Sequence, residues 1–486
     1  MSTDLALMDL SDVAAAIAAR RVTSLAVTEA CLARIRIWQP EVNCFIRLDE
    51  AAALETARQC DLELARGHRR GVLHGVPLAH KDLFYRAGRI STAGSRILRD
   101  YKPDFTATVL RRLDEAGSVD LGTLNMSEFA AGPTGHNVHY GDCRNAFDRT
   151  CVAGGSSSGS SVAVAARLVY GALGTDTGAS IRLPAAANGV TGLKPTYGRV
   201  SRHGVFPRSW SLDHVGPIAR TARDCAILLQ VIAGYDEMDA SSSAQKLPPI
   251  DKVFSQTRLE GLRIGVPSDG ALGDLDTDVA AALMEAKKIL ERLGATVRTV
   301  PFTDLAQMFQ VAEVLAKSEG AAIHRAWLQD RKQEYSNHVR IRIEAGLLIP
   351  ATQYIDAQRL RTVLTARFLD ETMAGIDALY LPVIPFSVPN IHETDIERRS
   401  GEEVLRVAGE MTRLTRPVNL LGLPAISVPC GFCNKGVPIA FQLVGHPFDE
   451  ATLLRVAHLY QQTTNFHRQV PSLQSTSATQ VVGANE

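Results

Sequence analysis

The chain has 486 residues, of which 52 are Lys or Arg and 52 are Asp or Glu, so its formal net charge is zero. A neutral chain has no long-range field that would attract nucleic acid or an anionic membrane, and neither is expected as a main partner. Hydrophobic residues make up 45% and charged residues 21% of the chain, which excludes a wholly disordered or collagen-like protein. A soluble globular protein is predicted.

No stretch reaches the roughly 18 uncharged apolar residues of a membrane-spanning helix, because Arg167 interrupts the most apolar stretch, residues 161–173. Asp4, Asp9 and Asp12 precede the first basic residue, whereas a secretory signal begins with positive charge. We therefore expect a cytoplasmic location. The eight cysteines are expected to be reduced and partly buried.

Helical and extended patterns alternate along the first half of the chain. Residues 1–67 have apolar residues at helical spacing and predict a helical N-terminal segment in which Pro40 ends a helix. Residues 72–235 are expected to hold the catalytic core, and their alternating pattern predicts the α/β class. The elements expected there are an apolar run ending at Lys81, a helix over 107–116, a strand over 119–122 and a helix over 222–233.

A second α/β segment follows an exposed connection. Residues 236–250 contain three consecutive serines and a Pro-Pro pair, which is typical of a loop. We predict a single domain over 1–472, with 251–472 completing the same sheet, and a disordered tail over 473–486. The later strands are expected at 262–266, 296–300, 378–383, 425–428 and 440–444, and the later helices at 279–293, 304–330, 353–374 and 450–463.

Residues 154–161 form a Gly/Ser run that allows several interpretations when taken alone. Glycines allow backbone N–H groups to surround a phosphate, but the lysine of a P-loop is missing. The run also satisfies G-x-S-x-G, which would make Ser157 a nucleophile, although no buried strand precedes it. A tight or flexible loop without a catalytic role is a further alternative.

Two other segments narrow these alternatives. Upstream lies His74-Gly-Val-Pro-Leu-Ala-His-Lys-Asp82, and downstream lies Gly174-Thr-Asp-Thr-Gly-Ala-Ser-Ile-Arg-Leu-Pro184. With the Gly/Ser run they resemble the amidase signature family, whose pattern is G-V-P-x-x-x-K-D, a Gly/Ser loop, and then G-[ST]-D-x-G-G-S-I-R-x-P-A. Ser156 and Ser180 are 24 positions apart, as are the family's bridging serine and nucleophile. Further similar segments at 191–196, 211–217 and 419–429 extend the resemblance over nearly the whole chain.

The resemblance implies an α/β/α sandwich with a large mixed central sheet covered by helices on both faces. It implies Ser180 as nucleophile, Ser156 as the serine on a cis peptide bond, and Lys81 as the base. It further implies an oxyanion hole formed by Thr177, Gly178, Ala179 and Ser180. Ser157, Asp176 and Arg182 match the family's orienting residues. Gly132, Pro133 and Thr134 match its loop over the substrate.

The implied activity is hydrolysis of a small-molecule amide through an acyl-enzyme, with carbamates and esters as further substrates of the same mechanism. No metal or organic cofactor is implied. The expected partners are the small-molecule amide and, as the family allows, a second copy of the chain, but neither nucleic acid nor a membrane.

The chemistry of amide hydrolysis explains why these residue types occur together. A serine hydroxyl is a weak nucleophile at neutral pH, and the leaving amine needs a proton, so one group has to act as base and then as acid. A lysine can do so when burial and nearby positive charge or dipoles lower its pKa from about 10.4. Lys81 at the end of an apolar run meets this requirement, and Ser156 would relay the proton.

Two positions depart from the family pattern. Ala179 replaces the usual second glycine of the downstream motif, and Ser158 replaces the glycine that usually follows the serine pair. We expect the methyl group of Ala179 to narrow the acyl pocket and to change which substrates fit, while activity survives.

Three alternatives compete with a free amidase. Within the same family, the chain is also compatible with the glutamine-hydrolysing subunit of a tRNA-dependent amidotransferase. From another class, His136, His139, Cys143 and Cys151 supply zinc-ligand types within 16 residues, which would suit a zinc-dependent hydrolase. The Cys430-Gly-Phe-Cys433 stretch has redox-motif spacing, but a turn rather than a helix is expected after it.

Overall fold

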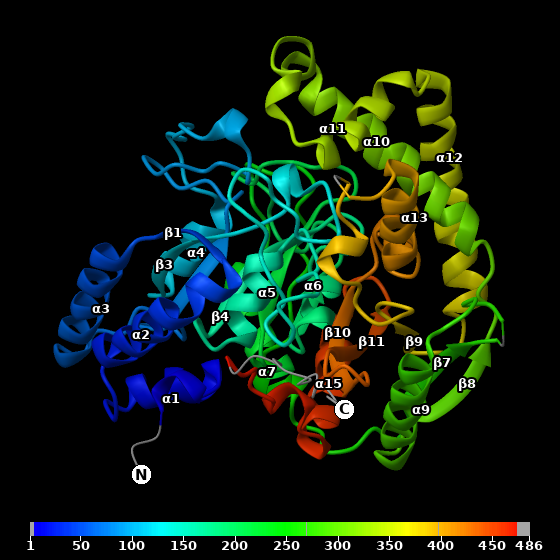
Figure 1. Cartoon of the computed structure of the whole chain (residues 1–486). Coiled ribbons are helices and arrows are strands. Elements are labelled where there is room, and N and C mark those ends of the chain that lie inside the picture. Colours follow the sequence, from blue (N-terminus) through cyan, green and yellow to red (C-terminus); the bar gives the residue numbers. More distant parts are fainter. Residues whose placement is uncertain (1–3, 269, 397, 474–486) are drawn as a thin grey trace, which may run out of the picture.

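The computed structural model describes residues 4–268, 270–396 and 398–473. These residues contain one mixed sheet of 11 strands in the order β1-β3-β2-β4-β6-β5-β10-β11-β9-β7-β8. The sheet crosses the whole molecule in Figure 1, from blue β1 on one side to green β8 on the other. Its strands are β1 (Phe45–Leu48), β2 (Pro77–Lys81), β3 (Val119–Leu124), β4 (Gly171–Asp176), β5 (Thr191–Lys194), β6 (His214–Ala219), β7 (Arg263–Pro267), β8 (Thr296–Val300), β9 (Ala378–Pro382), β10 (Ala425–Phe432) and β11 (Pro438–Gly445).

Strand direction places two catalytic candidates at one edge of the sheet. The central pairs of β4, β6, β5, β10, β11 and β9 are antiparallel, whereas β2 pairs in parallel with both β3 and β4. Parallel neighbours end at the same edge, where ligands of α/β sheets commonly bind. Lys81 ends β2 and Asp176 ends β4, so both lie at this edge.

Helices cover both faces of the sheet. Helix α6 packs against β10 and β11, and α15 packs against the same strands; α6 lies above them and α15 below them in Figure 1. The helices are α1 (Leu10–Ala18), α2 (Ser24–Val42), α3 (Glu50–Ala65), α4 (Thr108–Glu115), α5 (Ser158–Ala165), α6 (Arg182–Ala187), α7 (Ala222–Ile232), α8 (Ile250–Val253), α9 (Thr277–Arg292), α10 (Leu305–Asp330), α11 (Asn337–Glu344), α12 (Ala351–Arg367), α13 (Gly401–Thr412), α14 (Arg416–Leu420) and α15 (Glu450–Thr463).

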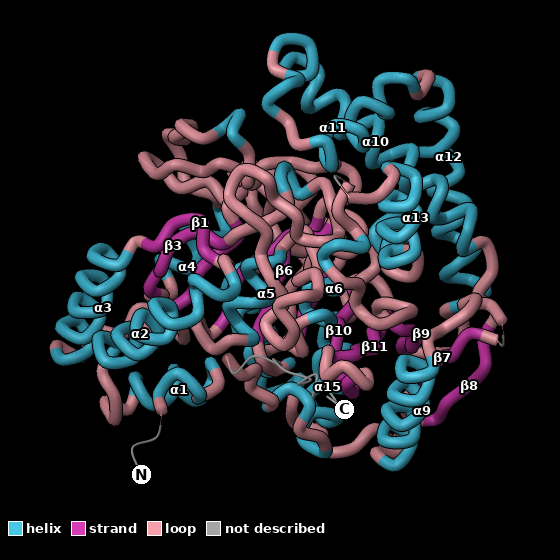
Figure 2. The backbone as a smooth tube through the Cα atoms, viewed as in Figure 1, coloured by secondary structure: helices cyan, strands magenta, loops and turns pink. Residues whose placement is uncertain are grey.

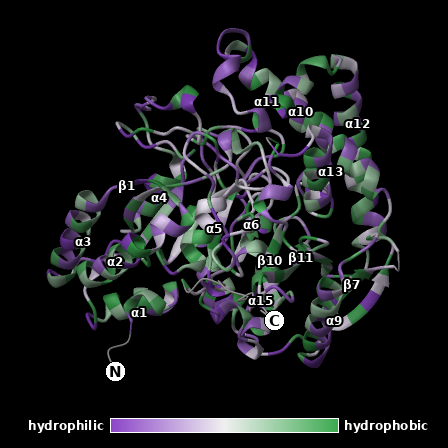
Figure 3. Ribbon diagram, viewed as in Figure 1, coloured by the Kyte–Doolittle hydropathy of each residue, from purple (hydrophilic) through white to green (hydrophobic). Residues whose placement is uncertain are grey.

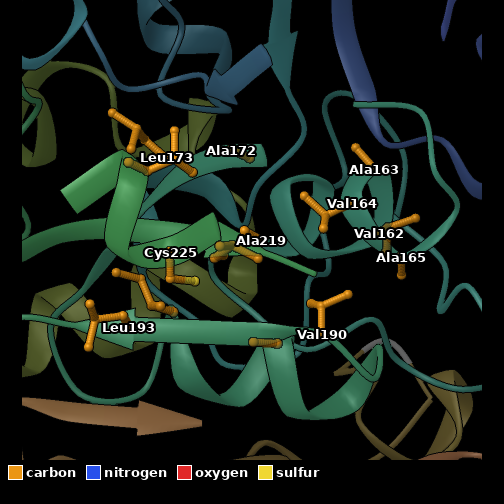
Figure 4. Packing of buried hydrophobic residues seen from close by; sticks show 14 of the residues in the cluster. Val162, Ala163, Val164, Ala165, Ala172, Leu173, Val190, Leu193, Ala219 and Cys225 are labelled. Atoms are coloured by element: carbon orange, nitrogen blue, oxygen red, sulfur yellow. The ribbon is translucent and has the colours of Figure 1, made fainter. Parts of the chain in front are cut away.

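The core consists of strands that are buried along their whole length. Every residue of β2, β4, β5, β6 and β11 is buried, as expected for strands covered on both faces. Figure 4 shows Val162 and Val164 of α5 in one cluster with Leu173 of β4 and Leu193 of β5. The outer helices α1, α2 and α12 carry both hydrophobic and hydrophilic residues in Figure 3, as helices with one face on the core do.

Loops, drawn in pink in Figure 2, gather in the middle of the molecule between β1 and α13. Helices α10, α11, α12 and α13 stand beside these loops (Figure 1). None of the helices within the described ranges is sufficiently long and apolar to pass through a membrane.

The predicted fold class is confirmed, and the late strands join the same sheet. Two details of the N-terminal segment are wrong. The segment expected to be wholly helical contains β1, which pairs with β3, and Pro40 lies inside α2, which continues to Val42. Of the tail predicted from residue 473, residues 474–486 lie outside the described part of the chain.

Candidate active site

Lys81 is buried and hydrogen-bonded to two hydroxyl groups. Only 1% of its surface is exposed, and Nζ donates to Ser156 Oγ at 2.7 Å and to Thr175 Oγ1 at 2.9 Å. Burial lowers the pKa of Lys81 to about 7, although the charges of Asp213 and Asp176 act in the opposite direction. The sequence predicted that burial together with nearby positive charge or dipoles would lower this pKa, whereas in the structure burial alone lowers it. A neutral amine in this position can accept the proton of Ser156.

Ser156 lies in the Gly/Ser loop and follows a cis peptide bond between Gly155 and Ser156. The Gly155 N–H donates to the carbonyl of Pro133 at 2.6 Å. A Cβ on Gly155 would come within 2.7 Å of Ser127 Oγ and 2.8 Å of the Gly132 carbonyl, closer than real Cβ contacts. Only glycine fits at this position. Its close approach brings the loop of Ser156 against the loop of Gly132 and Pro133.

The turn at residues 177–180 offers unpaired backbone donors beside the predicted nucleophile. None of its four N–H groups donates a hydrogen bond to another described residue. Ser180 is 9% exposed, and its hydroxyl also has no hydrogen-bonding partner within the described ranges. All four residues line one cavity. Free N–H groups beside a nucleophile are the donors that a tetrahedral intermediate requires for its negative oxygen.

A buried ion pair fixes both ends of this turn. Arg182 Nε donates to Asp176 Oδ2 at 3.0 Å, and both side chains are fully buried. Burial raises the pKa of Asp176, but Arg182, Lys194 and the amide of Asn419 outweigh it and hold that pKa well below its usual value. The Ile181 N–H also donates to Asp176 Oδ2, at 3.1 Å. Asp176 and Arg182 therefore hold the two ends of the turn in place.

Two further residues connect the turn to Lys81. Thr175 accepts from Lys81, and its own N–H donates to Ser157 Oγ at 3.3 Å, so Ser157 positions Thr175. Asp213 Oδ1 accepts from the hydroxyl of Thr177 at 2.5 Å. No role was predicted for Thr175 or Asp213, although both lie in segments that resemble the family.

Ser180, the predicted nucleophile, lines a cavity of about 440 Å³, a volume within the range of small-molecule sites. Gly132 and Pro133 line it as predicted for the substrate loop, whereas Thr134 is buried and is not among the described residues that line it. Ala179 also lines the cavity, and its φ is not positive, so alanine fits this position without backbone strain. Ser158 begins α5, and its hydroxyl donates to the Asn125 carbonyl at 3.4 Å.

The basic side chains around this cavity were not predicted from the sequence. They come from the loop after β5, from α10 and α11, and from α13 and α14, and they are Arg208, Lys317, Arg342, Arg406 and Arg416. No motif contains these residues, and their separations in the chain show no pattern. Only the packing of the helices against the loops brings them together.

The four predicted zinc ligands do not assemble. His136 contacts Asp142 and Thr394 at 2.8 Å each, while His139 contacts Glu128 at 2.9 Å. Within the part of the chain that the structure covers, no group of three His, Cys, Asp or Glu side chains is arranged to hold a metal ion. The zinc-hydrolase alternative is therefore wrong for these residues. Cys430 and Cys433, like the other six cysteines, are buried thiols.

Comparison with known proteins gives consistent matches. The profile of the Amidase family matches residues 26–454. A glutamyl-tRNA(Gln) amidotransferase subunit from Myxococcus xanthus is 41% identical, over 96% of this chain and 98% of the relative. The native peptide amidase from Stenotrophomonas maltophilia is 30% identical, with a TM-score of 0.81 over 96% of this chain and 99% of that chain. A chain from a vestigial protein complex that reveals the evolutionary origins of an s-triazine catabolic enzyme is 35% identical, with a TM-score of 0.85 over 94% of this chain and 98% of that chain.

These matches contradict the expected partners. We expected a small molecule, at most with a second copy of the chain, and no nucleic acid. A relative that spans nearly the whole chain is named as a subunit of an enzyme acting on tRNA. Zero net charge was a poor guide, because net charge describes the whole chain and says nothing about a local surface or a partner subunit. The fold, the order of the motifs and the family profile agree, and the chain belongs to the amidase signature family.

Proposed function

We propose that this chain hydrolyses a carboxamide, with Ser180 as the nucleophile and release of ammonia or an amine. The observation that carries the proposal is the 2.7 Å hydrogen bond from buried Lys81 to Ser156. Burial lowers the pKa of Lys81 to about 7, so that a large share of the lysine is neutral near neutral pH and can act as a base.

In the first half of the reaction, Ser156 passes the proton of the Ser180 hydroxyl to Lys81 Nζ as Ser180 Oγ attacks the carbonyl carbon. The N–H groups of residues 177–180 hold the oxygen that becomes negative. The proton then returns through Ser156 to the leaving nitrogen, the C–N bond breaks, and an ester to Ser180 remains. Water attacks this ester by the same proton route and releases the acid.

Two settings suit this chemistry, and the relatives' names support the first. It is the glutamine-hydrolysing subunit of a tRNA-dependent amidotransferase, the type of enzyme named for the Myxococcus xanthus relative. In this setting the ammonia passes to a partner that holds aminoacyl-tRNA, and the protein works in the cytoplasm, where that tRNA is used.

The charges of the cavity favour the second setting, hydrolysis of another small amide. Glutamine carries an ammonium group as well as a carboxylate. Glu313 is the only carboxylate among the described residues that line the cavity, and it is already paired with Lys317 at 2.7 Å and with Arg416. The similarity to a peptide amidase supports amide hydrolysis outside an amidotransferase.

The direct test is ammonia release by the purified chain from a panel of glutamine, peptide amides and aliphatic amides. We expect Ser180→Ala to lower kcat/KM about a thousandfold or more, since loss of a nucleophile removes the covalent route. Ser255→Ala, which changes an exposed serine outside the site, is the control. Full activity of Ser180→Ala would exclude the proposal.

The same panel separates the two settings. Glutamine as the best substrate, with ammonia transfer to tRNA-bound glutamate once amidotransferase partner subunits are added, supports the first setting. Preference for another amide, with no such transfer, supports the second.

A further inference from the structure

Positive charge exceeds negative charge in the cavity that contains the nucleophile. Five basic side chains and one carboxylate, Glu313, line it within the described residues. Glu313 contacts both Lys317 and Arg416. Glu313 is therefore shared by two cations, and Arg208, Arg342 and Arg406 are left without it. Of these three, Arg406 is exposed to solvent.

Arg208 and Arg342 use their guanidinium groups only on backbone carbonyls. Arg208 Nη1 donates to the Ala316 carbonyl at 3.1 Å, and Arg342 Nη1 donates to the carbonyls of His338 at 3.0 Å and Ala131 at 3.4 Å. No carboxylate of a described residue lies within 4.0 Å of either guanidinium group, the longest distance of an ion pair. This holds for Glu313 as well, which is paired with Lys317 and Arg416. A guanidinium has five N–H donors, so most of them remain available.

Burial lowers the pKa of Arg208, and the charges of Asp213 and Glu319 offset this effect only in part, so a further anion would be favourable here. Burial first, and then the charge of Arg208, lower the pKa of Arg342 to about 10. A carboxylate would relieve both effects, because its two oxygens accept paired hydrogen bonds from guanidinium groups.

These cations flank the reacting groups. A Cβ added to Gly132 would lie 3.4 Å from Arg342 Nη1, so Arg342 lies over the predicted substrate loop. The Arg208 N–H donates at 2.8 Å to Asp213, whose other oxygen accepts from Thr177 of the oxyanion turn. The scissile amide and a second group of the same small molecule can therefore bind at once.

We propose that the cavity selects amides that carry a carboxylate and no ammonium group, with Arg208 and Arg342 binding the carboxylate. The proposal names a substrate class for the hydrolysis proposed above and rests on it. An ammonium group would meet no free carboxylate, because Glu313 is shared between two cations and Asp213 already accepts hydrogen bonds from Thr177, Arg208 and Ser209.

Three five-carbon amides test this selection. Pentanamide is neutral, glutaramate adds a terminal carboxylate, and glutamine adds an ammonium group to glutaramate. We expect kcat/KM for glutaramate to exceed that for each of the other two by about tenfold or more, the usual size of one well-made charged contact. Pentanamide or glutamine hydrolysed as well as glutaramate would overturn the proposal.

Variants locate the carboxylate. Arg342→Met and Arg208→Met should each reduce the ratio of glutaramate to pentanamide kcat/KM about tenfold or more, while Lys288→Met, at an exposed lysine of α9, keeps the wild-type ratio. A ratio unaffected by both arginine changes would contradict the assignment. Because the ratio compares two substrates on one sample, partial misfolding does not alter it.

A short activated ester separates this proposal from the proposed hydrolysis. Acylation by 4-nitrophenyl acetate that disappears in Ser180→Ala supports the nucleophile, whatever the order of the amides. Loss of the Ser180 dependence with every substrate would instead refute the hydrolysis itself. If all three amides turn over too slowly to measure, they can be compared as inhibitors of the ester reaction. Glutaramate should then inhibit more strongly than pentanamide and glutamine, and any other order overturns the proposed substrate selection.

Discussion

At the scale of single residues, the central feature is an amine whose charge is removed by burial. Lys81 has 1% of its surface exposed, and burial lowers its pKa to about 7 against the pull of Asp213 and Asp176. The neutral form is the proposed base. The population of that form rises as the pH increases through 7, so the acylation rate should rise with it and then level off.

The residues proposed to be catalytic could be singled out from the sequence because they occur in short segments of fixed order. Lys81, Ser156 and Ser180 each lie within such a segment, and the structure places Lys81 and Ser156 in contact. Arg208 and Arg342 could not be found in this way. They are 134 positions apart in the chain, and each reaches the cavity from an element whose position depends on the whole fold.

At the scale of elements, the turn at residues 177–180 depends on the Asp176 and Arg182 pair. We expect Asp176→Asn to lower the free energy of unfolding by about 3–5 kcal/mol, because it leaves a fully buried guanidinium without its counter-charge. Urea denaturation followed by circular dichroism measures this loss. The variant should also lose amidase activity, since the N–H groups of 177–180 lose their support.

The matched control is an exposed pair, Lys288 with Glu285 on α9, at 2.7 Å. Glu285→Gln should cost less than about 1 kcal/mol because solvent screens the pair. Equal losses in the two variants would show that the buried pair has no special part in holding the turn.

The elements differ in how well local sequence predicts them. The strand over 296–300 and the helix over 450–463 agree with β8 and α15, since their patterns are long or clearly bounded. The strand β1 has four residues between two helices and owes its conformation to pairing with β3. Pro40 lies within α2, near its end, so proline is a weak stop signal there.

At the scale of the whole molecule, the late strands occupy the middle and one end of the sheet. β10 pairs with β5, and β11 connects β10 to β9, so residues beyond the 236–250 connection are built into the sheet of the first half. This topology supports one domain over 1–472.

Limited proteolysis tests that organisation. Trypsin should cut early at Lys246, an exposed residue of the connection. The two fragments should remain together at the size of the intact chain in size-exclusion chromatography, because shared strand pairing and buried surface hold them. Fragments that separate without denaturant would show that two independent domains exist.

The neutrality of Lys81 in the folded protein is tested most directly by NMR titration of its side chain with 13C-labelled lysine, assigned by comparison with Lys81→Met. We predict a midpoint near pH 7 and loss of this titration when the protein is unfolded, where the lysine titrates near 10.4. A Lys81 side chain that remains fully charged at pH 9 in the folded enzyme would contradict the account.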